Sequence, residues 1–157
     1  MHVIIATDGS KQSLTAARYA TTVLDATKVT DVSVLAVVRP LAAVSFSNEL
    51  GPSSAGRAAG EGASFRADAE AAIEVVAQVF ADWGPKVHKR TRSGSPANEI
   101  IKAATQLRAG LIVVASGSRG ISETVLLGST AQRVQQYAPC PVLVVRPSKK
   151  PRRAVRS

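Results

Sequence analysis

The sequence predicts an α/β fold: a single-domain, open, doubly wound sheet of five parallel strands with helices on both faces. Three observations predict it. Short β-branched segments alternate with segments of helical periodicity, which favours βαβ units joined by right-handed crossovers. The expected inner strands are apolar at nearly every residue, as in a sheet that is covered on both faces. The length of 157 residues fits one domain with its own core.

Five short segments rich in β-branched residues, bounded by turn-forming residues, are predicted strands. They are residues 3–7, 32–38, 86–92, 111–114 and 142–145. The third alternates basic and other residues around Val87, which is typical of an edge strand whose charges discourage unspecific pairing. The fourth is the most apolar, which predicts a central position in the sheet.

Four segments have apolar residues at helical spacing and are predicted helices. They are residues 11–25, 65–83, 96–107 and a last segment that runs from 129 to just before 139. Ser10 is the expected N-cap of the first helix. Ser95 is the expected N-cap of the third, with Pro96 at its first position. Ser129, with Gln132 three residues later, predicts a capping box at the start of the fourth.

Two segments do not fit this alternation. Residues 44–64 contain many helix and strand breakers and little that could form a core, which predicts a long mobile loop or a lid within a domain spanning 1–147. Residues 148–157 are rich in Lys, Arg and Pro and predict a disordered basic tail. Such a tail suits weak contact with nucleic acid or an acidic partner.

Composition excludes several classes of protein. With one Cys and two His, the chain cannot assemble a Cys/His zinc cluster or a disulfide framework by itself. A single thiol fits a reducing compartment. The N-terminal apolar run lacks a basic region before it, and no apolar stretch is long enough to span a membrane. A cytoplasmic protein is expected. Neither His2 nor His88 has an acidic residue at a suggestive spacing, so neither is expected to be catalytic or to bind metal.

The candidate site follows from the fold. Open α/β sheets bind ligands beyond the carboxyl ends of their strands, where the strand order reverses. Asp8 follows the first strand, Val37 ends the second, and the Gly/Ser-rich residues 115–120 follow the fourth. Gly128 and Ser129 begin the helix after them. Free N–H groups at a helix start suit phosphate.

These segments, in this order, resemble the universal stress protein family, small α/β proteins of the adenine-nucleotide alpha-hydrolase-like superfamily. The resemblance covers about residues 1–147 and is carried by residues 3–10, 94–96, 111–120, 126–130 and 139–145. It implies a Rossmann-like five-stranded sheet, a homodimer paired through the last strand at 142–146 and, in one branch of the family, bound ATP or AMP, with or without Mg²⁺.

The resemblance also implies roles for individual residues. Asp8 would accept hydrogen bonds from ribose or adenine, and Val37 would offer its backbone to an adenine edge. Apart from the resemblance, Arg119 in the loop after the fourth strand would either neutralise a phosphate or simply stay solvated. The expected nucleotide-binding residues are Ala6, Thr7, Asp8, Val37, Val114, Ala115, Gly117, Ser118, Arg119, Gly120, Gly128, Ser129 and Thr130.

The chain departs from the family pattern of Gly, two residues, Gly, nine residues and Gly-Ser. Without a gap, the first two family glycines fall on Ala115 and Ser118, where a Cβ would stand close to phosphate. On the literal Gly117 and Gly120, the stretch before Gly128 is two residues short. The spacing on both sides favours the ungapped register.

The functional expectation is a stress-response regulator that depends on a bound nucleotide and has, at most, slow incidental ATP hydrolysis. The alternative is a dimeric stress protein that binds no nucleotide and acts through protein contacts. Two local alternatives also stay open. Asp8 would equally serve as a turn or cap carboxylate beside Ser10, and Gly128 to Thr130 as the start of an ordinary Ser-capped helix.

Overall fold

A computed structural model describes residues 1–40, 54–117 and 128–146, and for residues 54–63 it describes the backbone alone. Five strands form one sheet. They are β1 (His2–Thr7), β2 (Asp31–Val38), β3 (Lys86–Ser93), β4 (Leu111–Ala115) and β5 (Val142–Val145). Every neighbouring pair is parallel and the order is β3-β2-β1-β4-β5, which confirms the predicted five-stranded parallel sheet.

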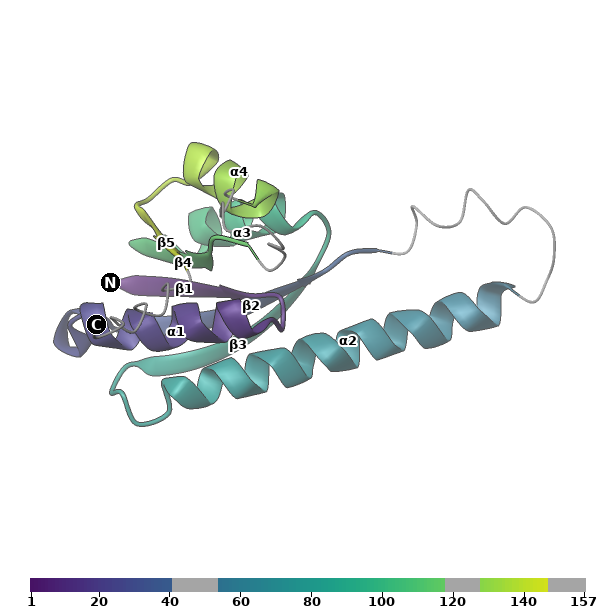
Figure 1. Cartoon of the computed structure of the whole chain (residues 1–157), viewed down its shortest axis with the longest axis horizontal. Helices are drawn as coiled ribbons and strands as arrows, with labels where there is room; N and C mark the ends of the chain where they lie inside the picture. The colour runs from purple at the N-terminus through teal and green to yellow at the C-terminus, as the bar shows by residue number, and fades with distance from the viewer. Residues whose placement is uncertain (41–53, 118–127, 147–157) are drawn as a thin grey trace, which may run out of the picture.

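Helices cover both faces of the sheet. They are α1 (Lys11–Val23), α2 (Ser54–Val79), α3 (Pro96–Gln106) and α4 (Ser129–Tyr137), with a short 3-10 turn, η1 (Ala26–Lys28), after α1. Figure 1 shows α3 and α4 above β1 and β4, with α1 and α2 on the opposite side of these strands. Each layer buries its own apolar cluster against the sheet, so the doubly wound architecture is confirmed.

The centre of the sheet is β1. Its residues Val3, Ile4 and Ile5 are fully buried, because each side chain enters one of the two apolar clusters. The segment at 111–114 was predicted to be central, but β4 lies between β1 and β5. The apolar residues of β4 show that helices cover both faces of this strand. Helices also cover both faces of β1, so an apolar sequence does not tell which strand is in the middle of the sheet. The predicted edge strand at 86–92 is confirmed as β3.

The prediction of a loop over 44–64 is wrong in its second half, because α2 begins at Ser54. Residues 54–64 hold four alanines, the residue with the strongest helix propensity, among three glycines that each cost about 1 kcal/mol in a helix. The helix therefore extends further than the apolar periodicity, and Figure 1 shows α2 projecting beyond the sheet. The first half of the predicted loop lies outside the described residues, as does the predicted tail at 148–157.

The predicted helix starts are partly confirmed. The Ser10 side chain caps α1 by accepting a hydrogen bond from Ser13 N–H at 3.2 Å. Ser95 is the N-cap of α3, although its side chain makes no capping bond. The capping box at Ser129 is wrong, because the N-cap of α4 is Gly128 and Ser129 is the first helical residue. Within the described residues, no helix is long and apolar enough to cross a membrane.

Substituting Phe80 tests the packing of α2 on the sheet. Phe80 is fully buried and its ring meets Trp83 edge-on at 5.5 Å. We expect Phe80→Ala to lower the free energy of unfolding by about 3–5 kcal/mol, measured by urea denaturation, because a large cavity replaces the ring. The matched control is Phe65→Ala inside α2, which Phe80 directly follows; the ring of Phe65 is 49% exposed and the loss should stay below about 1 kcal/mol. Equal losses at the two positions would contradict this packing.

Candidate functional site

A tight turn at the end of β1 forms the first part of the site. Thr7 is buried, its Oγ1 lies 2.9 Å from Ser13 Oγ, and it accepts a hydrogen bond from Gly9 N–H at 3.2 Å. Asp8 Oδ1 accepts a hydrogen bond from Ser10 N–H at 2.9 Å. Gly9 has a φ of +80°, which favours glycine. These bonds fix the turn and leave the Asp8 side chain exposed at the strand tip.

This turn lies where the strand order reverses. From β1 the chain passes to β2 on one side of the sheet, and from β3 it returns to β4 on the other. Thr7 is level with Ala36 of β2, and the pairing of β1 with β4 ends at Ile5 and Val113, two residues before the end of each strand. The carboxyl ends of β1, β2 and β4 therefore meet at one edge, where open α/β sheets bind ligands.

The start of α4 is anchored to the end of β4. Gly128 N–H donates to the carbonyl oxygen of Ser116 at 2.6 Å, and Ser116 N–H donates to the Val145 carbonyl oxygen at 3.0 Å. A Cβ on Gly128 would lie 3.0 Å from the Ser116 oxygen and 3.3 Å from Gly117 Cα. Glycine is required here because the backbone of β4 approaches so closely. Ser129 and Thr130 follow as the first helical residues.

Ser116 carries a buried hydroxyl that no sequence pattern singled out. The residue is 1% exposed and its Oγ has no hydrogen-bond partner among the described residues. A buried hydroxyl without a partner is costly, so such a group invites a ligand atom or a water. A lone Ser after a strand is too common in sequence to be noticed, and only the burial makes it informative.

The structure brings together ten of the predicted site residues at this edge. They are Ala6, Thr7, Asp8, Val37, Val114, Ala115, Gly117, Gly128, Ser129 and Thr130. Ser118, Arg119 and Gly120 lie outside the described residues. Ala115 is the last residue of β4 and is paired with Val145. Asp8 accepts the hydrogen bond from Ser10 N–H that its alternative role as a turn carboxylate requires. Its exposed carboxylate also lies beside the other nine residues.

A second polar cluster lies at the opposite end of the strands, and we call it the histidine cluster. His2 Nε2 lies 2.7 Å from Ser33 Oγ, and Arg90 Nε donates to the same oxygen at 3.0 Å. His88 Nε2 lies 2.8 Å from Asp31 Oδ1, and the two imidazole rings stack with centroids 6.0 Å apart. Sequence reasoning found no acidic partner for His88 because Asp31 is 57 residues away. Only the parallel register makes them neighbours.

The cluster shifts two pKa values. Hydrogen bonds from His88 and Thr30 hold the pKa of the Asp31 carboxyl below its ordinary 3.8. Burial lowers the pKa of His2 below its ordinary 6.5, and His88 and Arg90 add to this effect, while Asp31 opposes it. Burial also raises the pKa of Cys140, which keeps that thiol protonated. Within the described ranges, no group of three or more His, Cys, Asp or Glu side chains could hold a metal ion.

Comparison with known proteins agrees with this architecture. The family model described as "Universal stress protein family" matches residues 1–146. A universal stress protein from Methanocaldococcus jannaschii is 35% identical over 148 residues, which are 94% of this chain and 83% of that protein.

Two solved structures share the fold. Universal stress protein UspA from Lactobacillus plantarum aligns with a TM-score of 0.74 at 23% identity, over 93% of this chain and 97% of that one. A universal stress protein family protein from Arabidopsis thaliana, with AMP bound, aligns with a TM-score of 0.65 at 16% identity, over 94% of this chain and 92% of that one.

The histidine cluster predicts how stability depends on pH. The folded pKa of His2 is lowered, so the unfolded chain binds more protons just below pH 6.5 and stability falls as the pH drops through this window. The contribution of Asp31 is lost at lower pH, below 3.8. Between about pH 7.5 and 5, we expect the free energy of unfolding, measured with urea, to fall less steeply in His2→Gln than in wild type.

High salt is the control for this experiment. Salt screens charge interactions far more than burial, which is the largest cause of the His2 shift, so the difference between the two proteins should persist. If the free energy of unfolding changed with pH in the same way in wild type and His2→Gln, burial of His2 would not be the cause of the pH dependence of stability.

Proposed function

The chain belongs to the universal stress protein family, and on this premise we propose that it binds an adenine nucleotide, ATP or AMP, at the carboxyl ends of β1, β2 and β4. Nucleotide occupancy would make it a stress-response regulator. The observation that carries the proposal is the convergence of the Asp8 carboxylate and the N-terminus of α4 at the point where the strand order reverses. The Arabidopsis relative of the same fold has AMP bound.

The two ends of the nucleotide would meet different chemistry. Asp8 offers carboxylate oxygens to ribose hydroxyls, and Val37 offers its backbone at the end of β2. The first turn of α4 has no acidic residue, and its leading N–H groups have no partner within the helix. This arrangement favours a phosphate at Ser129 and Thr130.

Gly128 would contribute in a different way. Its N–H is already used by the Ser116 carbonyl oxygen, so it is not a phosphate donor in this state. Its role is to let α4 begin close to β4, because a Cβ would meet that oxygen at 3.0 Å. The unpartnered Ser116 hydroxyl lies on the residue that accepts this bond, and a phosphate oxygen or an ordered water beside it would supply its missing partner.

The proposed protein is a binder and regulator, with at most slow ATP hydrolysis. Efficient phosphoryl transfer uses a carboxylate that holds Mg²⁺, a cation on the phosphate and a group that positions the nucleophile. Asp8 is the single acid among the proposed site residues. If Mg²⁺ accompanies ATP, most of its ligands would come from the phosphates and water.

The second candidate is a family member that has lost its nucleotide and acts through protein contacts. Ala115 favours it, since in the ungapped register this residue stands where nucleotide-binding relatives would have glycine. A reducing compartment such as the cytoplasm is proposed for either candidate, because the chain has a single cysteine and no second one with which to form a disulfide.

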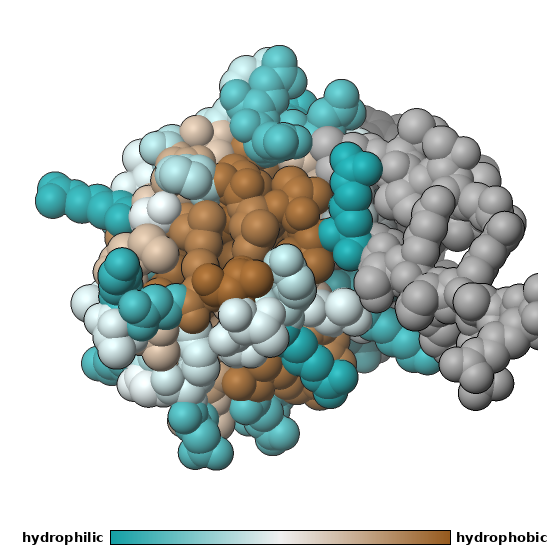
Figure 2. Space-filling view, turned by 60° about the vertical axis from the view of Figure 1, so that its left-hand side comes forward, coloured by the Kyte–Doolittle hydropathy of each residue, from teal (hydrophilic) through white to brown (hydrophobic). Residues whose placement is uncertain are grey.

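A homodimer through β5 is proposed for both candidates. β5 is an edge strand of four apolar residues, three of which are only half-buried in one chain. Figure 2 shows a continuous hydrophobic area on the side of the molecule that carries the β5 edge in Figure 1. Pairing of residues 142–146 with a second copy would give hydrogen-bond partners to the outward N–H and C=O groups of β5 and would cover its apolar side chains.

Isothermal titration calorimetry with ATP and with AMP tests the nucleotide site. We expect wild type to bind one nucleotide per chain and Asp8→Ala to weaken binding about tenfold or more, since charge-assisted hydrogen bonds to ribose are lost. The control is Asp82→Ala, an exposed carboxylate between α2 and β3, which should bind as wild type does. No heat with either nucleotide, together with an unshifted melting temperature, would favour the second candidate over the nucleotide sensor.

Val144→Pro tests the dimer. Ile112 N–H donates to the Pro141 oxygen and Ser116 N–H to the Val145 oxygen, so odd-numbered residues of β5 face β4. The Val144 N–H points away from the sheet. Proline there should leave the fold intact and shift the mass in sedimentation equilibrium toward the monomer. Thr91→Pro on the opposite edge, β3, is the control and should remain dimeric. A dimer that survives Val144→Pro unchanged would place the interface elsewhere.

A further inference from the structure

The two edges of the sheet differ in chemistry. β5 is apolar, whereas β3 alternates basic and other side chains. β3 pairs with β2 along all eight of its residues, without a bulge. No strand of the described ranges pairs with its other side. An edge of this length is a template for another extended segment unless something makes pairing selective.

The hydrogen bonds of β3 identify the groups that face outward. Lys86 N–H donates to the Thr30 oxygen at 3.1 Å, and Gly94 N–H donates to the Val38 oxygen at 3.0 Å. In a parallel strand, successive residues direct their N–H and C=O groups to opposite sides. Even-numbered residues of β3 therefore bond to β2. The outward backbone groups are those of Val87, Lys89, Thr91 and Ser93.

The charges of β3 would select the partner. The strand has four Lys and Arg residues and no acid. Lys89 pairs with Glu74 at 2.6 Å and Arg92 with Glu99 at 3.3 Å. Among the described residues, neither Lys86 nor Arg90 has an ion pair. Two copies of this edge would therefore bring like charges together, while an acidic segment would meet Arg90 and Arg92 two residues apart on one side of the strand.

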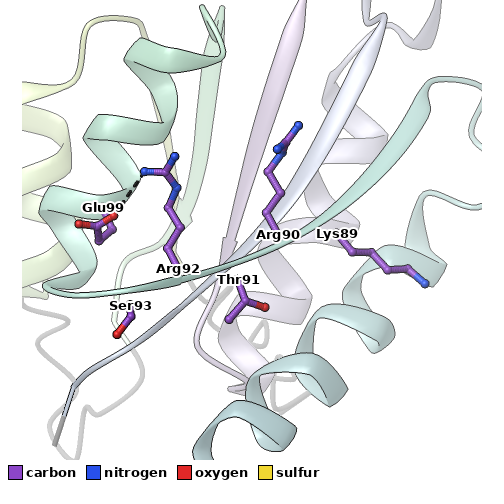
Figure 3. Close-up of a pocket in the computed structure, with 6 residues that line it drawn as sticks. All are labelled: Lys89, Arg90, Thr91, Arg92, Ser93 and Glu99. Carbon is purple, nitrogen blue, oxygen red and sulfur yellow. Dashed lines mark hydrogen bonds and ion pairs between the residues drawn. The ribbon is translucent and has the colours of Figure 1, made fainter.

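An open hollow of about 570 Å³ runs along this edge, lined by Lys89, Arg90, Thr91, Arg92, Ser93 and Glu99. Figure 3 shows Arg90 and Arg92 pointing to one side of the strand and Thr91 and Ser93 to the other. Arg90 is held in place because its Nε donates to Ser33 Oγ at 3.0 Å. Arg92 also donates to Gln106. The two guanidinium groups are thus positioned before any partner arrives.

We propose that the β3 edge binds an extended acidic segment of a partner protein, which adds to the sheet as a sixth strand. Backbone bonds to the outward groups of β3 provide the affinity, and acidic side chains at alternate positions meet Arg90 and Arg92. Nucleic acid fits less well, because β3 has no Phe, Tyr or Trp on which bases could stack, because the His88 ring stacks on His2, and because Glu74 and Glu99 flank the strand.

The probe is a fluorescent nine-residue peptide of alternating Glu and Thr, which places every Glu on one face of a strand. We expect it to bind the full chain in an anisotropy titration, with an affinity that falls as salt rises. Thr91→Pro removes an outward N–H without touching the bonds to β2, and it should weaken binding about tenfold or more. Thr91→Val is the matched control, which keeps the N–H and should bind within about twofold of wild type.

Two further peptides keep the test independent of how Thr91→Pro folds. The same peptide methylated at alternate backbone nitrogens and a Lys/Thr peptide should both fail to bind wild type. Amide exchange at Lys89 and Thr91 should slow when the Glu/Thr peptide is bound. The proposal is overturned if the Glu/Thr peptide does not bind, if the methylated peptide binds equally well, or if oligo-dT binds more tightly and Thr91→Pro has no effect.

Discussion

The structure depends on the burial of β1 between two parallel neighbours. Val3, Ile4 and Ile5 are fully buried and enter both apolar clusters, so the two helical layers pack against the same strand from opposite sides. Because the neighbours of β1 are β2 and β4, the chain must reverse its winding direction there. The carboxyl ends of β1, β2 and β4 thus come together at this point. The Thr7 and Ser13 bonds then set the turn that presents Asp8.

Elements that depend on local chemistry could be predicted from the sequence. The Ser10 cap, the Pro96 start and the edge character of β3 follow from residues that lie close together along the chain. The start of α2 could not be predicted, because its alanines, glycines and polar residues leave no apolar period to read. The capping box at Ser129 failed for another reason. The Ser116 carbonyl oxygen, far away in sequence, fixes Gly128 in the N-cap position.

Some residues of the candidate site could likewise be predicted from the sequence, and others could not. Asp8, Val37 and Gly128 could be predicted, because strand ends and a glycine before a helix are visible in sequence. The orphaned Ser116 hydroxyl and the histidine cluster could not, since each depends on burial or on strand register. His2, Asp31 and His88 come from three strands; the register places His2 level with Asp31, and His88 level with Ser33, two residues further along β2. No periodicity along one segment encodes this register, so these groups are visible only in the assembled sheet.

The two edge strands, β5 and β3, differ in composition because they contribute differently to the two apolar clusters. Leu143 and Val145 pack toward α1 and α2 while Val142 and Val144 pack toward α3 and α4, so β5 must be apolar on both faces. On β3, Val87 alone joins an apolar cluster, and its other side chains are free to be charged. An apolar edge is stabilised by a second copy of itself, whereas a basic edge repels one. The proposed homodimer and the proposed acidic partner would therefore use opposite edges of the sheet and would not compete.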